Sequence, residues 1–411
     1  MKTFIPLIIN TDIFGYYWSR SMNDEYGVKS YILGHVPLAL TNTSKIIEHI
    51  KYVDDLKTDE NYVNEVITYA KEIKQLHPDA EIVLVPTNDD YVQLTINNRE
   101  ALEAHVKFHV PSKELMDQIM DKEKFYDLAT KHGLSMAYTI FHQVGDSIPD
   151  VPADNFPMVV KPNDGILYYK NPFEGQDKIF FCDTPERMHE VINMVEASGY
   201  DDKLILQEYI PGNDTYLGDA HLYVNTEGGV QFVSLSQVIL QEPEGSAIGN
   251  YVTLISRYDR KIMETFKEFL LDIGYTGFAN FDFKRDAETG EYKVFEINMR
   301  AGRSAYYVEY SGESLAKNLV DDIVYDKRHN DTHYLEDGFV SSFAPSSVIK
   351  RFAEDGPAKE DALRTMKAGH LYNPLRNPKD KSLKRWSYLT MRDINYIKKF
   401  RDNDWTDTSK N

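Results

Sequence analysis

The sequence has little cysteine and no long apolar run. Cys182 is the single cysteine among 411 residues, so no disulfide can form within the chain, and a reducing compartment fits. No stretch reaches the roughly 18 apolar residues that a membrane-spanning helix needs. The start, MKTFIPLIINTD, has too short an apolar run for a secretory signal. We therefore expect a cytoplasmic protein without a membrane span.

Positive charge is also scarce, because 46 Lys and Arg stand against 65 Asp and Glu and give a formal net charge of −19. Nucleic-acid binding needs a basic footprint, so we expect no nucleic-acid partner. An anionic small molecule remains possible, since a few local cations can hold a phosphate. Hydrophobic residues make up 42% of the chain, which suits a globular protein of two or three domains.

Two common site motifs are missing as well. No GxGxxG dinucleotide fingerprint occurs, and no HExxH or close histidine pair suggests a zinc site. Instead, the first part of the chain alternates apolar strands (4–10, 29–34 and 81–85) with amphipathic helical stretches. This alternation predicts an open, parallel α/β sheet. Ligands of such sheets lie beyond the carboxyl ends of the strands, here at residues 11–12 and 87–90.

A row of polar side chains stands out in KVFEINMRAGRS (293–304), where Glu296, Asn298 and Arg300 are two residues apart. On a strand these three share one face. A hairpin that turns about Thr289 would place Asp282 opposite Glu296, and two facing carboxylates repel. A divalent cation between them would remove the conflict, and oxygen ligands alone suit Mg²⁺ or Mn²⁺. The alternative is a solvated sheet face with a surface arginine.

Two lysines and one strand end could hold a nucleotide. Lys161 ends the apolar strand MVVK and has a compact charge suited to a phosphate, although lysines at strand ends are common without a ligand. Lys122 begins a helix. The strand LILQEYIPG places Gln207 and Glu208 at its end, where backbone groups can meet an adenine edge. It could equally be a strand that leaves its sheet.

In this order the pieces resemble the ATP-grasp superfamily of carboxylate–amine ligases. The ordered set is Asp121-Lys122, Lys161-Pro162, QEYIPG (207–212), Asp282 and EINMR (296–300), and it covers roughly residues 1–320. The resemblance implies a mixed α/β and α+β protein, with an ATP-grasp fold preceded by an open parallel-sheet, Rossmann-like domain. It implies an N-terminal domain (1–115), a central ATP-grasp subdomain (116–205), a C-terminal ATP-grasp subdomain with the metal site (206–325) and a C-terminal extension (326–411).

The resemblance also assigns roles to single residues. Lys122 and Lys161 would contact the ATP phosphates, Gln207, Glu208 and Ile210 would form the adenine hinge, and Asp214 would bind the ribose. The magnesium ligands would be Asp282, Glu296 and Asn298, and Arg300 would neutralise charge at an acyl phosphate. Two departures from the family pattern are a phosphate loop with only Gly165 and Gly175, and Gln-Glu in place of the common Glu-Lys hinge pair.

The N-terminal segment resembles the bacterial D-aspartate ligases of cell-wall synthesis. The matching residues are Asp12, Arg20 and EYGVKS (25–30). The likeness implies that D-aspartate is activated with ATP and joined to the lysine side chain of a nucleotide-linked peptidoglycan precursor. A second carboxylate on the acid needs a cation, for which Arg300, Arg303, Arg257 and Arg20 are candidates. Salt bridges in an acid-rich protein are the other interpretation of Arg303 and Arg257.

Other functions stay open from the sequence. The chain could be an ATP-grasp ligase for another acid or a non-catalytic nucleotide-binding module. A carbamoyl-phosphate-type enzyme usually has a duplicated core, and no repeat is present. The basic segment 376–401, with Trp386, Tyr388 and Tyr396, could bind the nucleotide end of a precursor. The simpler interpretation is a basic helix packed on an acidic body.

Overall fold

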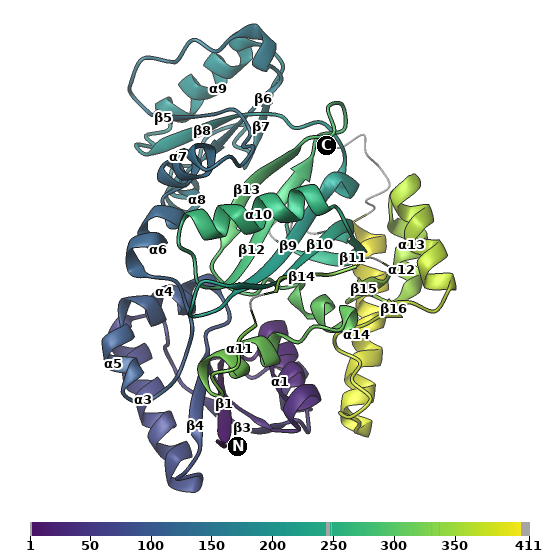
Figure 1. Cartoon of the computed structure of the whole chain (residues 1–411). Coiled ribbons are helices and arrows are strands. Elements are labelled where there is room, and N and C mark those ends of the chain that lie inside the picture. The colour runs from purple at the N-terminus through teal and green to yellow at the C-terminus, as the bar shows by residue number, and fades with distance from the viewer. Residues whose placement is uncertain (1, 244–246, 248, 330, 337, 404–411) are drawn as a thin grey trace. The chain divides into compact units, whose positions relative to one another are not determined.

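The computed structural model describes residues 2–243, 247, 249–329, 331–336 and 338–403. The chain folds into two compact units (Figure 1). Unit 1 contains the chain up to residue 121, residues 213–283 and the chain from residue 296, and unit 2 contains residues 122–212 and 284–295. The four-part division expected from the sequence stays a prediction.

Unit 1 begins with a parallel sheet of strand order β3-β2-β1-β4. Its strands are β1 (Phe4–Ile9), β2 (Ser30–Gly34), β3 (Ile47–Tyr52) and β4 (Glu81–Val85). Strands β1, β2 and β4 are almost wholly buried, as expected of a parallel sheet with both faces covered. The predicted open parallel sheet is confirmed. Strand β3 was not predicted, because only Ile47 of this edge strand is buried.

Helices follow the strands of this sheet and place polar residues at its carboxyl edge. They are α1 (Ile13–Tyr26), α2 (Ala39–Asn42), α3 (Asp59–Leu76), α4 (Asp89–Asn97), α5 (Arg99–Glu103) and α6 (Lys113–Met120). Asp12 caps α1 by accepting hydrogen bonds from the backbone N–H groups of Phe14 and Gly15. Asn88 caps α4 in the same way. Asp12 and Asp89 therefore lie at neighbouring strand ends, because β1 and β4 are adjacent.

The second sheet of unit 1 has the order β13-β12-β9-β10-β11-β15-β16, with β14 paired to β10 (Figure 1). Its strands are β9 (Leu217–Val224), β10 (Val230–Gln241), β11 (Tyr251–Arg257), β12 (Gly277–Arg285), β13 (Tyr292–Asn298), β14 (His333–Tyr334), β15 (Val340–Ser342) and β16 (Leu371–Tyr372). The amphipathic helix α10 (Arg260–Asp272) packs on β9 and β10. This leaves the opposite face for polar side chains. Residues 284–295, at the tip of the β12–β13 hairpin, belong to unit 2.

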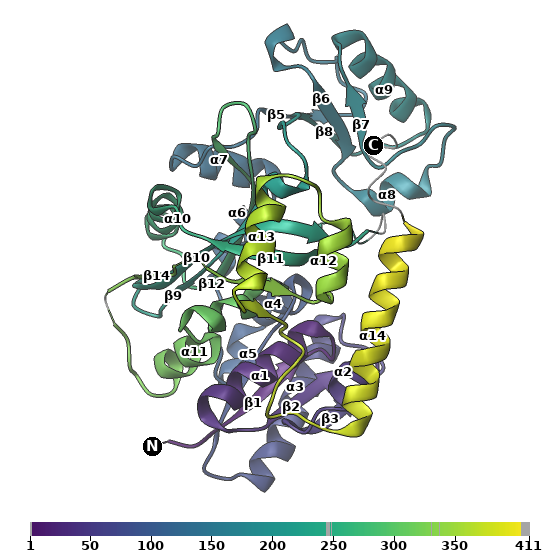
Figure 2. The ribbon, with the colours of Figure 1, turned by 90° about the vertical axis from the view of Figure 1, so that its right-hand side faces the viewer.

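The remaining elements of unit 1 are short helical turns and C-terminal helices. They are η2 (Asp214–Tyr216), η4 (Ala305–Ser311), α11 (Leu315–Ile323), α12 (Ser346–Phe352), α13 (Pro357–Lys367) and α14 (Leu383–Asp402). Helix α14 contacts α12 and also α2 of the N-terminal part (Figure 2). The C-terminal segment is therefore packed on the rest of unit 1. This agrees with the simpler interpretation of segment 376–401 as a helix that packs on the body of the protein.

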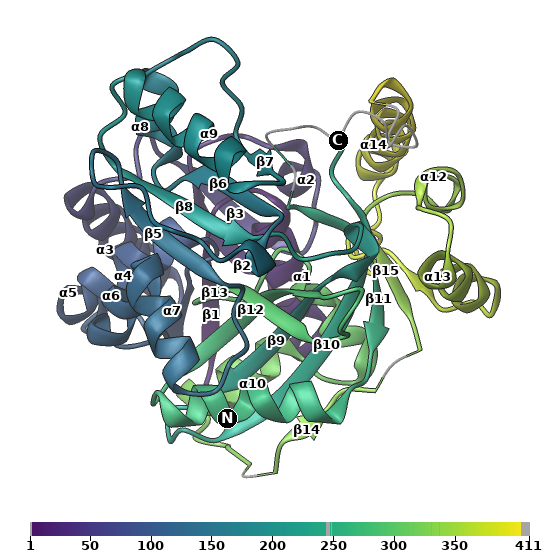
Figure 3. The ribbon, with the colours of Figure 1, turned by 90° about the horizontal axis from the view of Figure 1, so that it is seen from above.

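Unit 2 is built on an antiparallel sheet of order β5-β8-β6-β7, with α9 on one face (Figure 3). Its elements are α7 (Lys122–Lys131), β5 (Thr139–Gln143), η1 (Ala153–Asn155), β6 (Met158–Pro162), α8 (Gly165–Lys170), β7 (Phe180–Cys182), α9 (Pro185–Ala197) and β8 (Lys203–Glu208). The segment that the resemblance assigns to a phosphate loop, with Gly165 and Gly175, contains helix α8. Across the described ranges of both units, no helix is long and apolar enough to cross a membrane.

Candidate active site

The predicted polar row lies on one side of the β12–β13 hairpin in unit 1. Asn298 donates from Nδ2 to Oδ2 of Asp282 over 2.9 Å and to Oδ1 of Asn280 over 3.3 Å. The alternate residues Phe281, Phe283 and Ile297 are buried, and the Phe281 ring stacks on Phe266 of α10 at 4.5 Å. The hairpin thus has one apolar and one polar face, as its sequence predicts. Asn280 is a member of the row that the sequence analysis missed.

Asp282 lies in a strongly acidic environment. Burial raises the pKa of its carboxyl well above the usual range, the nearby Glu296 and Asp219 carboxylates raise it further, and Arg300 lowers it. Ionised carboxylates gathered in this way are unfavourable without a counter-charge. A bound divalent cation would supply that charge, so these residues fit the ion that the resemblance implies.

The donor set also fits magnesium. The row offers two carboxylates, from Asp282 and Glu296, and the amide of Asn298. Within the described ranges no group of three or more His, Cys, Asp and Glu could hold a metal ion. Mg²⁺ takes one or two carboxylates and completes its octahedral shell with water and substrate phosphates. The amide nitrogen of Asn298 faces Asp282, and the amide oxygen faces Arg300. Turning this amide over would present its oxygen to a cation beside Asp282.

Arg300 follows β13 and points toward the N-terminal sheet. Its Nη2 forms a 2.8 Å ion pair with Asp89 and donates to Oδ1 of Asn298 over 3.3 Å. Its guanidinium lies over the Phe14 ring at 5.4 Å. Its buried Nε has no hydrogen-bond partner among the described residues. The arginine therefore joins the polar row to the carboxyl edge of the N-terminal sheet, where ligands were expected.

Arg303 lies beside the row and is held by its own set of partners. Its Nη1 donates to the backbone oxygen of Tyr251 over 2.7 Å, and its Nη2 pairs with Glu242 at 3.1 Å. The Tyr251 side chain hydrogen-bonds Asp282. Burial raises the pKa of Asp12, whereas the nearby charge of Arg303 lowers it. Arg303 is thus linked to Asp282 through Tyr251 and lies near Asp12, and the substrate roles of Asp12 and Arg303 stay predictions.

A second layer of polar residues supports this face and was not found from the sequence. Asp219 is buried and accepts hydrogen bonds from the Ser236 and Ser304 hydroxyls. His221 is fully buried, and burial lowers its pKa to about 4. A Cβ at Gly302 would lie 2.6 Å from both Nε2 of His221 and Oδ1 of Asn280, so only glycine fits there. The glycine of EINMRAG could have indicated that the backbone here lies close to other groups, because glycine has no side chain.

Unit 2 carries the residues that the resemblance assigns to the nucleotide. Lys161 is the penultimate residue of β6 and donates to Oε1 of Gln207 over 3.1 Å. Gln207 is buried, and its Nε2 donates to the Tyr126 hydroxyl (2.6 Å) and to Thr139 Oγ1 (3.0 Å). The structure therefore brings Lys161 and the strand QEYIPG together on adjacent strands β6 and β8.

The other predicted nucleotide residues have different surroundings. Glu208 ends β8 and lies 3.8 Å from Nζ of Lys293, and Ile210 is buried. Lys122 is exposed at the first position of α7. Asp214 belongs to unit 1, where it starts η2 and raises the pKa of Glu354 as a secondary cause after burial.

Two predicted substrate residues are held by protein partners. Arg257 donates from Nε to Gln237 over 2.8 Å and pairs with Asp361. Arg20 pairs with Asp24 at 3.2 Å, donates to the Pro374 carbonyl over 2.8 Å and lies over the Tyr306 ring. The structure therefore does not bring these two arginines into contact with the metal row through any described bond. Their roles toward a substrate stay predictions.

Comparison with curated proteins finds a relative along the full chain. The chain is 29% identical over 409 residues to a D-aspartate ligase of Enterococcus faecium (strain Aus0004), covering 97% of this chain and 96% of that protein. No family model matches the chain. The resemblance seen in the N-terminal segment therefore extends over nearly the whole sequence.

Solved structures with the same fold include two enzymes described with bound ADP and one amino acid ligase. An ADP complex of N5-carboxyaminoimidazole ribonucleotide synthetase matches with a TM-score of 0.54 at 14% identity, covering 82% of this chain and 81% of that chain. The biotin carboxylase domain of Hydrogenobacter thermophilus 2-oxoglutarate carboxylase, with MgADP, ADP and bicarbonate, gives 0.58 at 14% identity, covering 83% and 74%. An L-amino acid ligase from Bacillus licheniformis gives 0.55 at 14% identity, covering 83% and 79%.

Proposed function

We propose that this chain, which has the ATP-grasp fold, is an ATP-dependent carboxylate–amine ligase. The observation that carries the proposal is the chain of contacts from Asp282 through Asn298 to Arg300 and Asp89. In this chain of contacts the carboxylates of Asp282 and Asp89, the Asn298 amide and the Arg300 guanidinium lie beside the carboxyl edge of a parallel sheet. The full-length similarity to a D-aspartate ligase supports D-aspartate as the acid.

The reaction has two steps. A carboxylate oxygen of the acid attacks the γ-phosphorus of ATP, which releases ADP and leaves an acyl phosphate. An amine then attacks the acyl carbon, phosphate leaves, and an amide bond forms with loss of the amine proton. The protein contributes positioning and charge neutralisation rather than a covalent nucleophile.

The predicted site residues of unit 1 each have a task in this scheme. Asp282, Glu296 and Asn298 hold Mg²⁺ or Mn²⁺, which supplies positive charge to the ATP phosphates when bound. Arg300 holds the charge that develops on the transferred phosphoryl group and acyl oxygen. Arg303 and Asp12 bind the acid, with Arg303 on a carboxylate and Asp12 near the amino group.

Residues of unit 2 bind ATP in this proposal. Lys122 and Lys161 contact phosphate oxygens, and Gln207, Glu208 and Ile210 present backbone groups to adenine. The hydrogen bond of Lys161 to Gln207 supports a link between phosphate and adenine recognition. Asp214 binds the ribose.

The amine acceptor is the lysine side chain of a nucleotide-linked peptidoglycan precursor, and the protein acts in the cytoplasm. These two statements rest on the similarity to the D-aspartate ligase. An ATP-grasp ligase for a different acid is the second candidate, because the half-buried Arg300 and Arg303 can hold other anions.

The first test measures ADP release with ATP and Mg²⁺ against a panel of D- and L-amino acids, with and without a lysine-containing precursor. We expect release that depends on D-aspartate, and an amide product when the precursor is present. Release with another acid would keep the ligase and replace the substrate. ATP binding without release in any mixture would support a nucleotide-binding module and refute the ligase.

The metal assignment has its own variants. Asp282→Asn and Glu296→Gln should each lower ADP release by about 10³-fold or more, because several kcal/mol of charge stabilisation depend on the cation. EDTA should abolish release in the wild-type chain. Glu291→Gln is the matched control, since Glu291 lies on the same hairpin with an exposed side chain. Full activity of either row variant at ordinary Mg²⁺ would make the assignment wrong.

A further inference from the structure

The C-terminal helix α14 reaches the neighbourhood of the metal row through one buried carboxylate. Glu242 directly follows β10 and is 5% exposed. It accepts hydrogen bonds from the Tyr396 hydroxyl at 2.5 Å and from Lys399 Nζ at 3.0 Å, both on α14. The same carboxylate holds Nη2 of Arg303 at 3.1 Å. Arg303 and two residues of α14 that are more than 90 positions away in the sequence therefore meet at Glu242.

Two cations, Arg303 and Lys399, contact the carboxylate of Glu242. Although burial alone would raise the pKa of Glu242, the hydrogen bond from Tyr396 and the charges of Arg303 and Lys399 lower it overall. Glu242 therefore stays ionised, and Lys399 takes up part of the attraction that would otherwise neutralise Arg303. Asp12 is the further acid that faces Arg303.

Tyr251 links the guanidinium of Arg303 to Asp282 of the polar row. The carbonyl of Tyr251 accepts from Arg303 over 2.7 Å, and the side chain of the same residue hydrogen-bonds Asp282. The bonds to Tyr251 and Glu242 use two of the five N–H donors of a guanidinium, which leaves three for a ligand. Its plane is also steadied by the Phe343 ring at 5.0 Å.

We propose that Arg303 recognises the second, unreacted carboxylate of a dicarboxylic acid, and that Tyr396 and Lys399 of α14 are positioning residues that orient Arg303 through Glu242. This inference rests on the proposed ligase function and adds a task for the C-terminal extension. A carboxylate binds a fixed guanidinium in a bidentate manner. Arg303 and Asp282 both contact Tyr251, so a carboxylate held by Arg303 would lie on the same side of the site as the proposed metal ligands.

The test compares binding of aspartate and alanine by isothermal titration calorimetry in the presence of MgADP. The wild-type chain should prefer the dicarboxylic acid. Arg303→Met should weaken aspartate binding about 100-fold, and Lys399→Met and Tyr396→Phe about tenfold, because each loses a charge-assisted contact or its support. Lys399→Arg should restore most of the loss. Lys398→Met is the control, because Lys398 is the exposed neighbour on the same helix.

Steady-state kinetics separates positioning from a general structural role. For Lys399→Met we expect a higher KM for the acid, with kcat and the KM for ATP within about threefold of wild type. Equal effects of Lys399→Met and Lys398→Met, a parallel rise of the ATP KM, or no preference for aspartate in the wild type would overturn the inference. A chain that binds aspartate in this pattern but forms no amide would refute the proposed ligase alone, since calorimetry needs no turnover.

Discussion

At the scale of single residues, geometry distinguishes arginines that were equivalent in the sequence. Arg300 contacts Asp89 and, in the polar row, Asn298. Arg20 instead donates hydrogen bonds to the backbone carbonyls of residues 373 and 374. A guanidinium offers five donors in a fixed plane, and a lysine offers one rotating ammonium. The task proposed for Arg300 therefore depends on its shape as well as on its charge.

Replacing Arg300 with lysine tests this dependence. We expect Arg300→Lys to lower kcat by about 10²–10³-fold, the range for loss of one preorganised donor at a developing negative charge. The KM for ATP should change much less. Arg285→Lys serves as the control, because Arg285 is exposed on the same hairpin. A kcat within twofold of wild type in stopped-flow ADP release would show that Arg300 acts only through its charge.

The single cysteine offers a second test at this scale. Cys182 is buried in unit 2, and burial raises the pKa of its thiol to about 11 from 9.0. The thiolate fraction at pH 8 is then about 100-fold below that of an ordinary thiol. We expect very slow alkylation by iodoacetamide in the native protein, fast alkylation in urea, and full activity of Cys182→Ala. Rapid native alkylation that stops ADP release would give the thiol a role.

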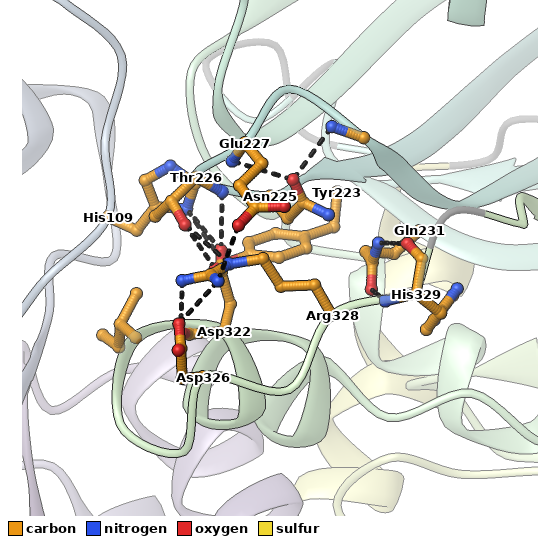
Figure 4. A network of polar contacts seen from close by, with 12 residues as sticks. His109, Tyr223, Asn225, Thr226, Glu227, Gln231, Asp322, Asp326, Arg328 and His329 are labelled. Carbon is orange, nitrogen blue, oxygen red and sulfur yellow. Dashed lines mark hydrogen bonds and ion pairs between the residues drawn. The ribbon is translucent and has the colours of Figure 1, made fainter.

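At the scale of elements, a buried polar network joins α11 to the β9–β10 hairpin (Figure 4). Asp322 of α11 accepts from the Tyr223 hydroxyl (2.8 Å), the Thr226 backbone N–H (2.9 Å) and Arg328 Nε (2.6 Å). His109, which precedes α6, lies 2.9 Å from the Tyr223 hydroxyl and 3.4 Å from Asp322. Three distant segments are thus fastened at one carboxylate.

This network predicts a loss of stability in acid. Burial lowers the pKa of His109 to about 4 from 6.5, partly offset by Asp322. The folded state binds the proton less readily than the unfolded state, so this contribution is complete above pH 6.5 and declines as the pH falls toward 4. The expected loss at pH 5 is about 2 kcal/mol from this residue.

Urea unfolding of wild type and His109→Asn at pH 7.5 and pH 5 would measure that loss. We expect the wild type to lose about 2 kcal/mol more than the variant over this interval, because asparagine does not titrate. His221 contributes equally to both chains and cancels. An equal decline in the two chains would mean that His109 does not carry the effect.

Elements could be predicted from the sequence where the pattern is local. Strand β1, helix α1 and the two-faced β12–β13 hairpin follow from apolar runs, an amphipathic stretch and alternation. Edge strand β3 was missed because its exposed residues give no apolar run. The network around Asp322 was missed because His109 and Tyr223 are more than 100 residues apart, and no local pattern records such a contact.

The site residues also differ in whether a local sequence pattern predicts them. Asp282, Glu296, Asn298 and Arg300 could be predicted together because they alternate with apolar residues along the two strands of one hairpin. Their supports Asp219, Ser236 and Ser304 come from different strands and a loop, so only the folded sheet brings them together. Glu242, which holds Arg303, was also missed, since its partners lie on the C-terminal helix.

At the scale of the whole molecule, the C-terminal segment is an integral part of unit 1. Asp380, just before α14, is 3% exposed and accepts from Lys45 N (2.7 Å), Ser44 Oγ (2.8 Å) and the Tyr16 hydroxyl (3.1 Å). Arg385 is 1% exposed, forms a 3.1 Å ion pair with Asp380 and lies over the Tyr16 ring at 4.0 Å. The segment from Asp380 to Lys399 is therefore anchored in the N-terminal sheet domain as well as at Glu242.

Breaking this anchor should destabilise the protein without touching the chemistry. Arg385→Met removes one partner of a fully buried pair and leaves Asp380 uncompensated, a change that costs about 3–5 kcal/mol. Lys384→Met, at the exposed neighbouring position, should stay within about 0.5 kcal/mol of wild type. Urea unfolding measures both. The double variant Asp380→Asn/Arg385→Met should recover part of the loss, because no buried charge then lacks its counter-ion. A cost for Arg385→Met no larger than that of the control would mean that the C-terminal segment folds on unit 1 independently of this pair.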